Sequence, residues 1–495
     1  MRTVVATRSG FAAVPVVAIG AALGVVLLAC ASRYGYHRDE LYFRVAGHHL
    51  AWGYVDQPPL TPVLARVGVA VFGDSALGLR VIPALVAACT VVVAGLLARE
   101  LRSGRGGQVL AAAAVAVTAM ILQAGHSLST PTTDILLWLV IATILARLLA
   151  EENPRWFLPL GVVVGVAMLN KYTVLLLVVS VTIALGPVGP RAVLRSSWVA
   201  AGAVVALGVA SPNLLWQWHH DFPMLSVASG IGGDDGVQNR LVLVPMQFLI
   251  VGPPMAVICA VGLHRLVRDP ALGFARCLGL AYPMAVCLLL IVGGKFYYAF
   301  GLLAVLLVAG AQPVVDWARG RLRTGVVVAA VVLTGVVDGL LMLPLLPVES
   351  ATVSNAVNPE QGAQIGWPEL VAAVRVGWDA VPAVQRGTAT IVTANYGEAG
   401  AIDRFGPEVD LPRAYSGHMS FYEWGPPPDS HTGPVLLVTG SDQHGLTRTF
   451  HGCRVVVSID NGVGIDTDEQ GGAVWLCDPT DLSWSRLWPT LRRFS

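Results

Sequence analysis

The chain has 495 residues, of which 55% are hydrophobic and only 13% are charged, whereas a soluble domain carries about 25% charged residues. This composition excludes an ordinary soluble protein and indicates a membrane protein. Residues 1–349 hold 23 basic and 15 acidic side chains and residues 350–495 hold 9 and 16, so a basic membrane part precedes an acidic tail. The basic residues are scattered among apolar runs, which gives no reason to expect nucleic acid as a partner.

Apolar runs long enough to cross a bilayer dominate the first two thirds of the chain, since a spanning helix needs about 20 apolar residues. The sequence predicts eleven spans, at 11–31, 77–98, 108–125, 132–150, 156–170, 172–187, 197–215, 241–263, 274–293, 297–315 and 325–346. The polar breaks around Lys171 and Lys295 are so short that tight turns must join the helices on either side. The expected fold class is therefore mainly α, a polytopic membrane domain over residues 1–349.

The distribution of arginine and lysine predicts the orientation of these spans. With a cytoplasmic N-terminus, the inner segments collect fifteen basic residues and the outer segments before the tail collect seven. This orientation places a first loop at 32–76, both lysines, Trp216–Asp221 and the tail on the outer side. The first run is long enough to span, so we expect a retained helix rather than a signal peptide.

The first loop contains "RDELYFRVAGHHLAWGYVDQPPL", in which Asp39 and Glu40 follow directly on the first span. Adjacent carboxylates raise each other's pKa, so one of them can act as a base towards a hydroxyl within hydrogen-bond reach. A solvated acidic pair balanced by Arg38 and Arg44 is the alternative. The apolar stretch at 57–73 starts with prolines and is interrupted by Arg66, which predicts a helix lying in the membrane interface.

Further polar residues lie beside spans on the same predicted face. Asp134 begins a span, where a carboxylate also suits the helix dipole. Lys171 and Lys295 lie between apolar runs and can either extend to the headgroups or bind a lipid phosphate. His219 and His220 in "WQWHHD" can bind phosphate or a metal, although this short run is a weak metal signal and no zinc spacing is present, so a divalent metal stays open. Together these groups are what a reaction with an anionic lipid requires.

The acidic tail differs in pattern from the membrane part. The segments "TATIVTA", "PVLLVTG", "CRVVVSI" and "AVWLC" are short β-rich runs, and "YGEAGAIDRF" between them predicts a helix. About 145 residues are enough for one small extracytoplasmic α/β domain at 350–495. Cys453 and Cys477 can form a disulfide or remain buried thiols, and the other five cysteines are expected to pack inside spans.

Five segments in chain order resemble bacterial members of the GT-C glycosyltransferase superfamily. They are "RDELYFRVAGHHLAWGYVDQPPL", "FGDSALGLRVIPAL", "TPTTDILLWL", "GVAMLNKYT" and "GGKFYYAFGLLAVLLVAGA", and the tail segment "NYGEAGAIDRFG" is similar to that of bacterial relatives. The resemblance covers about residues 11–346 and is greatest to the branch of protein O-mannosyltransferases and the lipid A aminoarabinose transferase. It implies a GT-C fold, a polyprenyl-phosphate sugar donor, and transfer with inversion on the outer face of the bacterial plasma membrane. The implied acceptors are lipids, glycans or proteins.

The resemblance also implies roles for individual residues. Asp39 matches the base and Glu40 its partner, which would orient the base or the acceptor. The positions that would lie near the donor and its phosphate are Asp134, Lys171, Lys295, Arg44, His219, His220 and Tyr297. The sequence departs from the pattern at Tyr42, where the aminoarabinose transferase has a basic residue; Arg44 or Arg38 would have to substitute.

Two other function classes remain open from the sequence. A transporter or flippase of a lipid-linked or anionic solute would also carry ionisable residues in its spans, but transporters often show internal repeats and none is visible here. A non-catalytic glycan-binding protein would use the aromatic segment "YSGHMSFYEWGPP" to stack on sugars. The intact Asp39–Glu40 pair favours an enzyme over that scaffold.

Overall fold

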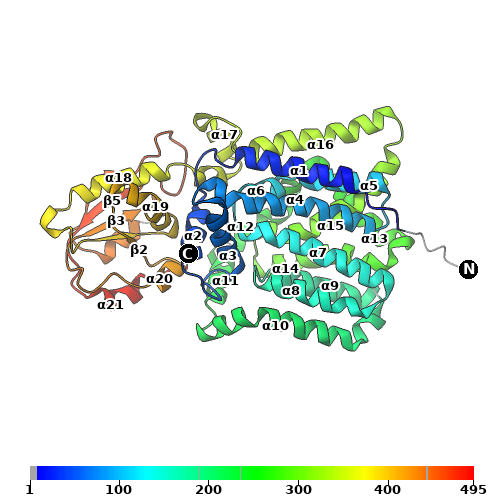
Figure 1. Cartoon of the computed structure of the whole chain (residues 1–495), viewed down its shortest axis with the longest axis horizontal. Helices are drawn as coiled ribbons and strands as arrows, with labels where there is room; N and C mark the ends of the chain where they lie inside the picture. The colour runs from blue at the N-terminus through cyan, green and yellow to red at the C-terminus, as the bar shows by residue number, and fades with distance from the viewer. Residues whose placement is uncertain (1–7, 189, 235, 442–443, 495) are drawn as a thin grey trace, which may run out of the picture. The chain divides into compact units, whose positions relative to one another are not determined.

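The computed structural model describes residues 8–188, 190–234, 236–441 and 444–494. The chain divides into two compact units (Figure 1). The helical unit comprises Met1–Ala31, Gln57–Thr61 and Arg80–Leu343, and the mixed unit comprises Ser32–Asp56, Pro62–Leu79 and Pro344–Ser495. The mixed unit therefore contains most of the first loop as well as the tail.

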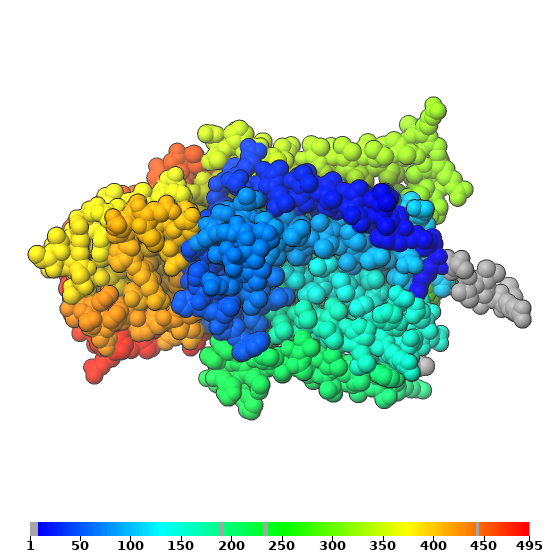
Figure 2. Space-filling view, in the orientation of Figure 1, coloured from blue at the N-terminus to red at the C-terminus, as the bar shows by residue number. Residues whose placement is uncertain are grey.

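Long apolar helices make up most of the helical unit. Seven helical segments are long and apolar enough to cross a membrane: α1 (Ala13–Cys30), α4 (Ala76–Glu100), α7 (Thr130–Glu151), α10 (Ser197–His219), α14 (Arg276–Val292) with the short turn before it, α15 (Phe300–Trp317) with the turn before it, and α16 (Arg321–Met342). Two further pairs are sharply bent: α5 (Arg105–Ala116) with α6 (Ala119–His126) at 62°, and α12 (Gly236–Val251) with α13 (Pro253–Arg268) at 102°. Figure 2 shows α16 (yellow-green) along the edge of this unit, where most of its apolar surface is open.

All eleven predicted runs coincide with helices, but the number of spans is smaller than predicted. Length and composition support seven spans, or nine if each bent pair is one span, among the described residues. The prediction of eleven counted α8 (Phe157–Met168) and α9 (Val174–Val188), which have 12 and 15 residues. At about 1.5 Å per residue these helices are roughly 18 and 22 Å long, short of the ~30 Å hydrocarbon core. The tight break between them, around Lys171, is confirmed.

Glycines allow the closest helix contacts in this unit. A Cβ atom at Gly262 of α13 would lie 1.8 Å from the Leu306 carbonyl oxygen on α15, and one at Gly310 of α15 would lie 2.0 Å from the Ile258 oxygen on α13. Small residues at such crossings let two backbones approach, which is how helices associate where lipid removes the hydrophobic driving force. This packing explains part of the high glycine content of the chain.

The mixed unit is built on one five-stranded sheet with the order β2-β1-β3-β5-β4. β1 (Thr390–Thr393) pairs in parallel with β2 (Ala414–Ser416) and β3 (Val435–Thr439), and β5 (Ala473–Cys477) pairs antiparallel with β3 and β4 (Arg454–Ser458). The four predicted strands are confirmed; β2, with three residues, gave no signal in the sequence.

Two helices of the mixed unit pack against this sheet. The predicted helix is α19 (Tyr396–Phe405), and α18 (Trp367–Asp379) packs beside it. Cys453 and Cys477 are joined by a disulfide between the neighbouring strands β4 and β5. The other α-helices among the described residues are α2 (Arg38–His48), α3 (Leu60–Phe72), α11 (Pro223–Asp234), α17 (Thr352–Asn355), α20 (Ser420–Glu423) and α21 (Trp484–Leu487).

Within the mixed unit, the first loop folds onto the tail. Helix α2 packs against α19. A Cβ atom at Gly397 would lie 2.6 Å from Cγ of Arg38, and one at Gly400 would lie 2.9 Å from Cβ of Leu41. Two glycines three residues apart lie on one face of a helix, so the "YGEAGA" segment gives α19 a smooth face for α2. This contact positions the "RDEL" segment.

Candidate active site

The start of helix α2 is fixed by a reciprocal cap. Nδ1 of His37 accepts the backbone N–H of Asp39 at 3.1 Å, and the Glu40 carboxylate accepts the backbone N–H of His37 at 2.8 Å. Glu40 is fully buried, so this carboxylate anchors the helix that carries Asp39. Burial lowers the pKa of His37, but the hydrogen bond and charge of Glu360, 2.7 Å from Nε2, outweigh it and leave the pKa raised.

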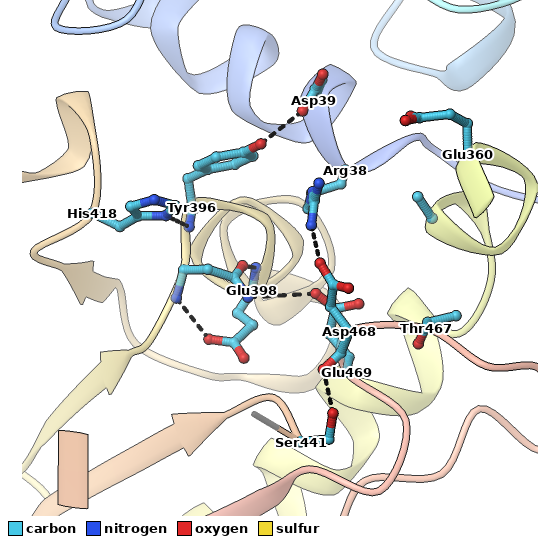
Figure 3. A network of polar contacts seen from close by, with 12 residues as sticks. Arg38, Asp39, Glu360, Tyr396, Glu398, His418, Ser441, Thr467, Asp468 and Glu469 are labelled. Carbon is cyan, nitrogen blue, oxygen red and sulfur yellow. Dashed lines mark hydrogen bonds and ion pairs between the residues drawn. The ribbon is translucent and has the colours of Figure 1, made fainter. Parts of the chain in front are cut away.

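Asp39 lies half-buried one residue into α2, and it is held by a side chain from the tail. The Tyr396 hydroxyl, at the start of α19, donates a hydrogen bond to Oδ1 of Asp39 at 2.8 Å (Figure 3). Burial, reinforced by the negative charge of Asp39, raises the pKa of Tyr396 well above its usual value, so the phenol stays protonated. No described residue donates a hydrogen bond to the second carboxylate oxygen of Asp39, which leaves it open to an incoming hydroxyl.

The neighbouring arginine ties the same two segments together. Arg38 forms an ion pair with Asp468, and its guanidinium lies 5.7 Å from the centre of the Tyr396 ring. Asp468 follows β4 and precedes β5, so the pair links residues 430 positions apart in the sequence (Figure 3). The first turn of α2 is thus held to the tail by two contacts, one from Tyr396 to Asp39 and one from Arg38 to Asp468.

A second carboxylate, Asp56, lies close enough to influence this site electrically. The Tyr42 hydroxyl donates to Oδ1 of Asp56 at 2.5 Å, and the Tyr42 ring lies 4.9 Å from that of Tyr396. Burial raises the pKa of Asp56 to about 6, and the charge of Asp39 adds to this effect. Two carboxylates are therefore each held by a tyrosine, and the two tyrosine rings contact each other.

Arg44 lies on α2 in an ion-pair cluster. Its guanidinium donates to both Asp74 oxygens at 2.7 and 2.6 Å and to Asp403 at 2.5 Å. The resemblance implied that Arg44 binds the donor phosphate. In the structure two carboxylates already occupy this guanidinium, which joins the first loop to α19.

The helical unit holds a separate group of predicted residues. Asp134, just after the first turn of α7, accepts hydrogen bonds from Trp138 Nε1 at 3.2 Å and Thr173 Oγ1 at 3.0 Å. The Lys171 ammonium lies 5.2 and 4.7 Å from the ring centres of Tyr297 and Tyr298, and it interacts electrostatically with Asp134. Asp134, Lys171 and Tyr297, predicted from separate segments, therefore belong to one cluster.

The start of helix α3 is attached to this cluster. The backbone N–H of Leu60 donates to the Leu169 carbonyl at 3.0 Å, and Thr61 contacts the Asn170 side chain at 3.4 Å. Asn170 in turn donates to the Thr130 carbonyl at 3.0 Å. The "QPPLT", "NKYT" and "TPTTD" segments therefore meet in space.

The other predicted donor residues have different surroundings. Lys295 immediately precedes the turn at Phe296–Ala299, and its ammonium forms no ion pair within the described ranges. His220 stacks on Trp216 at 3.9 Å and bonds its carbonyl, while His219 contacts Trp218; both histidines are exposed at the end of α10. In the part of the chain that the structure describes, no three His, Cys, Asp or Glu side chains are arranged to hold a metal ion.

Sequence reasoning missed several residues around Asp39. Tyr396, Asp468 and Asp403 all come from the tail, and Asp56 lies in the "GYVDQPP" segment. The signal for two of them was indirect. The tail segment "NYGEAGAIDRFG" includes Tyr396, Asp403 and three glycines, but nothing in it shows which helix it will contact.

Comparison with known proteins gives these clusters a context. Residues 56–216 match the family described as dolichyl-phosphate-mannose-protein mannosyltransferase, a segment that includes Asp56, Asp134 and Lys171. Over this segment the chain is similar to glycosyltransferases of that family. The resemblance found in the sequence is thereby confirmed, as is the enzyme class. No curated protein sequence matches the chain.

Solved structures extend the likeness to the fold of the chain. ArnT from Cupriavidus metallidurans in the apo state matches with a TM-score of 0.57 and 13% identity, over 93% of this chain and 97% of that one. The same protein bound to undecaprenyl phosphate gives 0.54 and 15%, over 95% and 99%. Arabinofuranosyltransferase AftD from Mycobacteria gives 0.53 and 12%, over 94% of this chain but 40% of its own length. At these identities the similarity shows the fold alone.

Proposed function

We propose that the chain transfers a sugar from a polyprenyl-phosphate donor to a lipid, glycan or protein acceptor on the outer face of the plasma membrane, with inversion. The matched family is named for a dolichyl-phosphate sugar, and one matched structure is bound to undecaprenyl phosphate. In this proposal residues 1–349 form the transferase domain, with the loop 32–76 facing outward. Residues 350–495 form an extracytoplasmic domain, and the N-terminus is cytoplasmic.

The observation that carries this proposal is the setting of Asp39. Its carboxylate is half-buried, one oxygen is held by Tyr396, and no described residue donates a hydrogen bond to the other. A general base needs a defined position and a free lone pair directed at the hydroxyl that it deprotonates. Glu40 contributes indirectly in this proposal, because it fixes the first turn of α2.

In the proposed transfer step, every bond that forms is matched by a bond that breaks, and the proton has an acceptor. The acceptor oxygen attacks the anomeric carbon from the face opposite the phosphate, the bond from that carbon to the phosphate oxygen breaks, and the acceptor proton passes to Asp39. The carbon passes through an oxocarbenium-like state, as in glycoside hydrolysis. Polyprenyl phosphate leaves with an added negative charge, which a nearby cation stabilises.

We assign the phosphate to the cluster around Lys171, with Asp134 and Tyr297 beside it and Lys295 as a second cation. A lysine ammonium is a compact charge that suits a phosphate, and Tyr297 and Tyr298 hold it in place. Arg44 is a weaker candidate because Asp74 and Asp403 already neutralise it. His219 and His220 stay as a further donor contact in the proposal.

The test is made on the full chain in lipid, supplied with polyprenyl-phosphate sugars and extracted envelope acceptors. Release of free polyprenyl phosphate is followed for wild type, Asp39→Asn and the control Asp410→Asn. Asp410 is exposed in the same unit with a left-handed backbone that asparagine tolerates. We expect a loss of about 10²- to 10⁴-fold for Asp39→Asn alone. Equal turnover in all three proteins would remove Asp39 from the mechanism.

A transporter or flippase is the second candidate, and one observation favours it. Asp338 of α16 is buried, accepts the backbone N–H of Ala119 at the start of α6, and lies next to Gly252 at the start of α13. Both bent helix pairs therefore break beside one carboxylate, as the interrupted helices of transporters do. Movement of labelled lipid between leaflets, with no release of polyprenyl phosphate from any donor, would support this candidate.

A further inference from the structure

We infer that Tyr396 is a positioning residue for Asp39, so that helix α19 of the tail sets the activity of the base in the first loop. The inference rests on the proposed function, because it assumes that Asp39 accepts the proton. It assigns the tail a role in the reaction that the sequence leaves open. The two residues are 357 positions apart, so only the fold brings them together.

Tyr396 is fixed at both of its ends. Its backbone N–H donates to Nδ1 of His418 at 3.3 Å, and the His418 ring stacks on it at 5.0 Å and 14°. Burial lowers the pKa of His418 to about 3, so this acceptor stays neutral at working pH. The Tyr42 ring and the Arg38 guanidinium contact the phenol from other directions. The hydroxyl therefore has few orientations besides the one on Asp39 (Figure 3).

The helix that carries Tyr396 is itself anchored at its first turn. Asn395 accepts the backbone N–H of Glu398 at 2.9 Å, and Glu398 accepts the backbone N–H groups of Ala394 and Asn395 at 2.8 and 3.0 Å. Asn395 also donates to Glu469 at 3.4 Å. Glu398 is fully buried, so this capping box forms part of the unit's core.

These contacts have a direct consequence for a base. A hydroxyl that donates to Oδ1 fixes the carboxylate plane and leaves the lone pairs of Oδ2 for the acceptor. The same hydrogen bond holds the carboxylate in this orientation. The other titratable or charged groups that act on Asp39 electrically are His37, Arg38 and Asp56. They stay in place when the Tyr396 hydroxyl is removed.

The test compares Tyr396→Phe with Tyr415→Phe in full-length protein in lipid. Tyr415 lies on β2 of the same unit, and its hydroxyl has no hydrogen-bond partner among the described residues. Hydrogen bonds to charged groups contribute about 1.5–3 kcal/mol, which corresponds to roughly 10- to 100-fold in rate. We expect kcat to fall by about that factor for Tyr396→Phe, with the donor KM within about twofold.

Two outcomes would overturn the inference while sparing the proposed function. The first is wild-type kcat in Tyr396→Phe when Asp39→Asn is inactive. The second is a loss of kcat accompanied by a raised donor KM and a lower thermal midpoint, which indicates a structural role. If Asp39→Asn keeps wild-type turnover, the proposed base itself fails and the inference fails with it.

A double-mutant cycle gives an independent measurement if Tyr396→Phe folds poorly. Adding Tyr396→Phe to Asp39→Asn should cost little further activity, because the hydroxyl then has no ionised carboxylate to orient. Losses that multiply would show that Tyr396 acts independently of Asp39 and would contradict the inference.

Discussion

The two clusters of polar residues, one in each unit, hold a carboxylate in different ways. In the mixed unit, Asp39 is held by Tyr396, which is 357 residues away, amid ion pairs that join distant segments. In the helical unit, Asp134 is held by Trp138, one turn along the same helix, and by Thr173. The contact that holds Asp39 depends on tertiary folding. Of the two contacts that hold Asp134, the one with Trp138 is local to its own helix. In the proposed function, this difference suits a base that needs a fixed orientation and a cation site that binds a mobile lipid.

After the loss of Asp39 itself, the largest effect is expected at the cation of the second cluster. Lys171→Gln removes the ammonium that lies between Tyr297 and Tyr298, and with it the charge proposed to face the phosphate. We expect kcat/KM for the donor to fall about 100-fold, which is about 2.7 kcal/mol. Initial rates at varied donor concentration measure this loss. Arg319→Gln, which removes a cation whose side chain is 83% exposed, is the control. Unchanged kinetics in Lys171→Gln would remove the lysine from donor binding.

The contrast between Arg44 and Lys171 gives the second prediction. Arg44→Met leaves Asp74 and Asp403 without their shared partner, so we expect the free energy of unfolding to fall by about 2 kcal/mol after discounting for the partly exposed carboxylates. Chemical denaturation in detergent measures this change. The donor KM should change little. A large rise in donor KM with unchanged stability would mean that Arg44 binds phosphate after all.

Gly400 tests whether α19 must lie directly on α2. A side chain there would meet Leu41 at 2.9 Å, a contact that Gly400→Val makes worse. Overpacking of this kind costs about 1–3 kcal/mol. We expect both a lower thermal midpoint and a loss of kcat of roughly tenfold, because the shift moves Tyr396 relative to Asp39. Gly387→Val, at a position with open space around it, is the control. Full activity in Gly400→Val would show that the packing of α19 on α2 does not affect the activity of Asp39.

The smallest effect concerns a buried carboxyl of the mixed unit. Burial raises the pKa of Glu469 from 4.5 to about 6, so the folded state binds this proton more tightly than the unfolded state. Its contribution to stability is present below pH 4.5 and is lost as the pH rises to about 6. Relative to wild type, Glu469→Gln should therefore gain up to about 2 kcal/mol between these values and stay level above them. Thermal unfolding at several pH values measures this; a difference independent of pH would contradict the assignment.

Much of the fold was predictable because its determinants are local. Each apolar run formed a helix, and α19 has the bounds predicted from "YGEAGAIDRF". The number of spans was overestimated because an apolar run shows that a helix lies in lipid or in the protein interior. It does not show that the helix is long enough to cross the bilayer. Strand β2 was missed because three residues carry no alternation.

The candidate site was predictable in part. Asp39, Asp134 and Lys171 were found because charged residues within or beside membrane spans are energetically costly and usually functional. Tyr396, Asp468 and Asp403 were not found, since their partners lie in a loop hundreds of residues earlier and only the packed glycines of α19 bring them there. The resemblance assigned roles to Glu40 and Arg44. In the structure Glu40 caps α2, and Arg44 contacts two carboxylates.

The central claim is most directly tested by one turnover measurement. Full-length protein in lipid is mixed with a polyprenyl-phosphate sugar and its acceptor, and free polyprenyl phosphate and glycosylated acceptor are counted together. Wild type should produce the two in equal amounts, with the opposite anomeric configuration in the product, and Asp39→Asn should produce neither at a comparable rate. Equal production by both proteins, or release without glycosylated acceptor, would contradict the account.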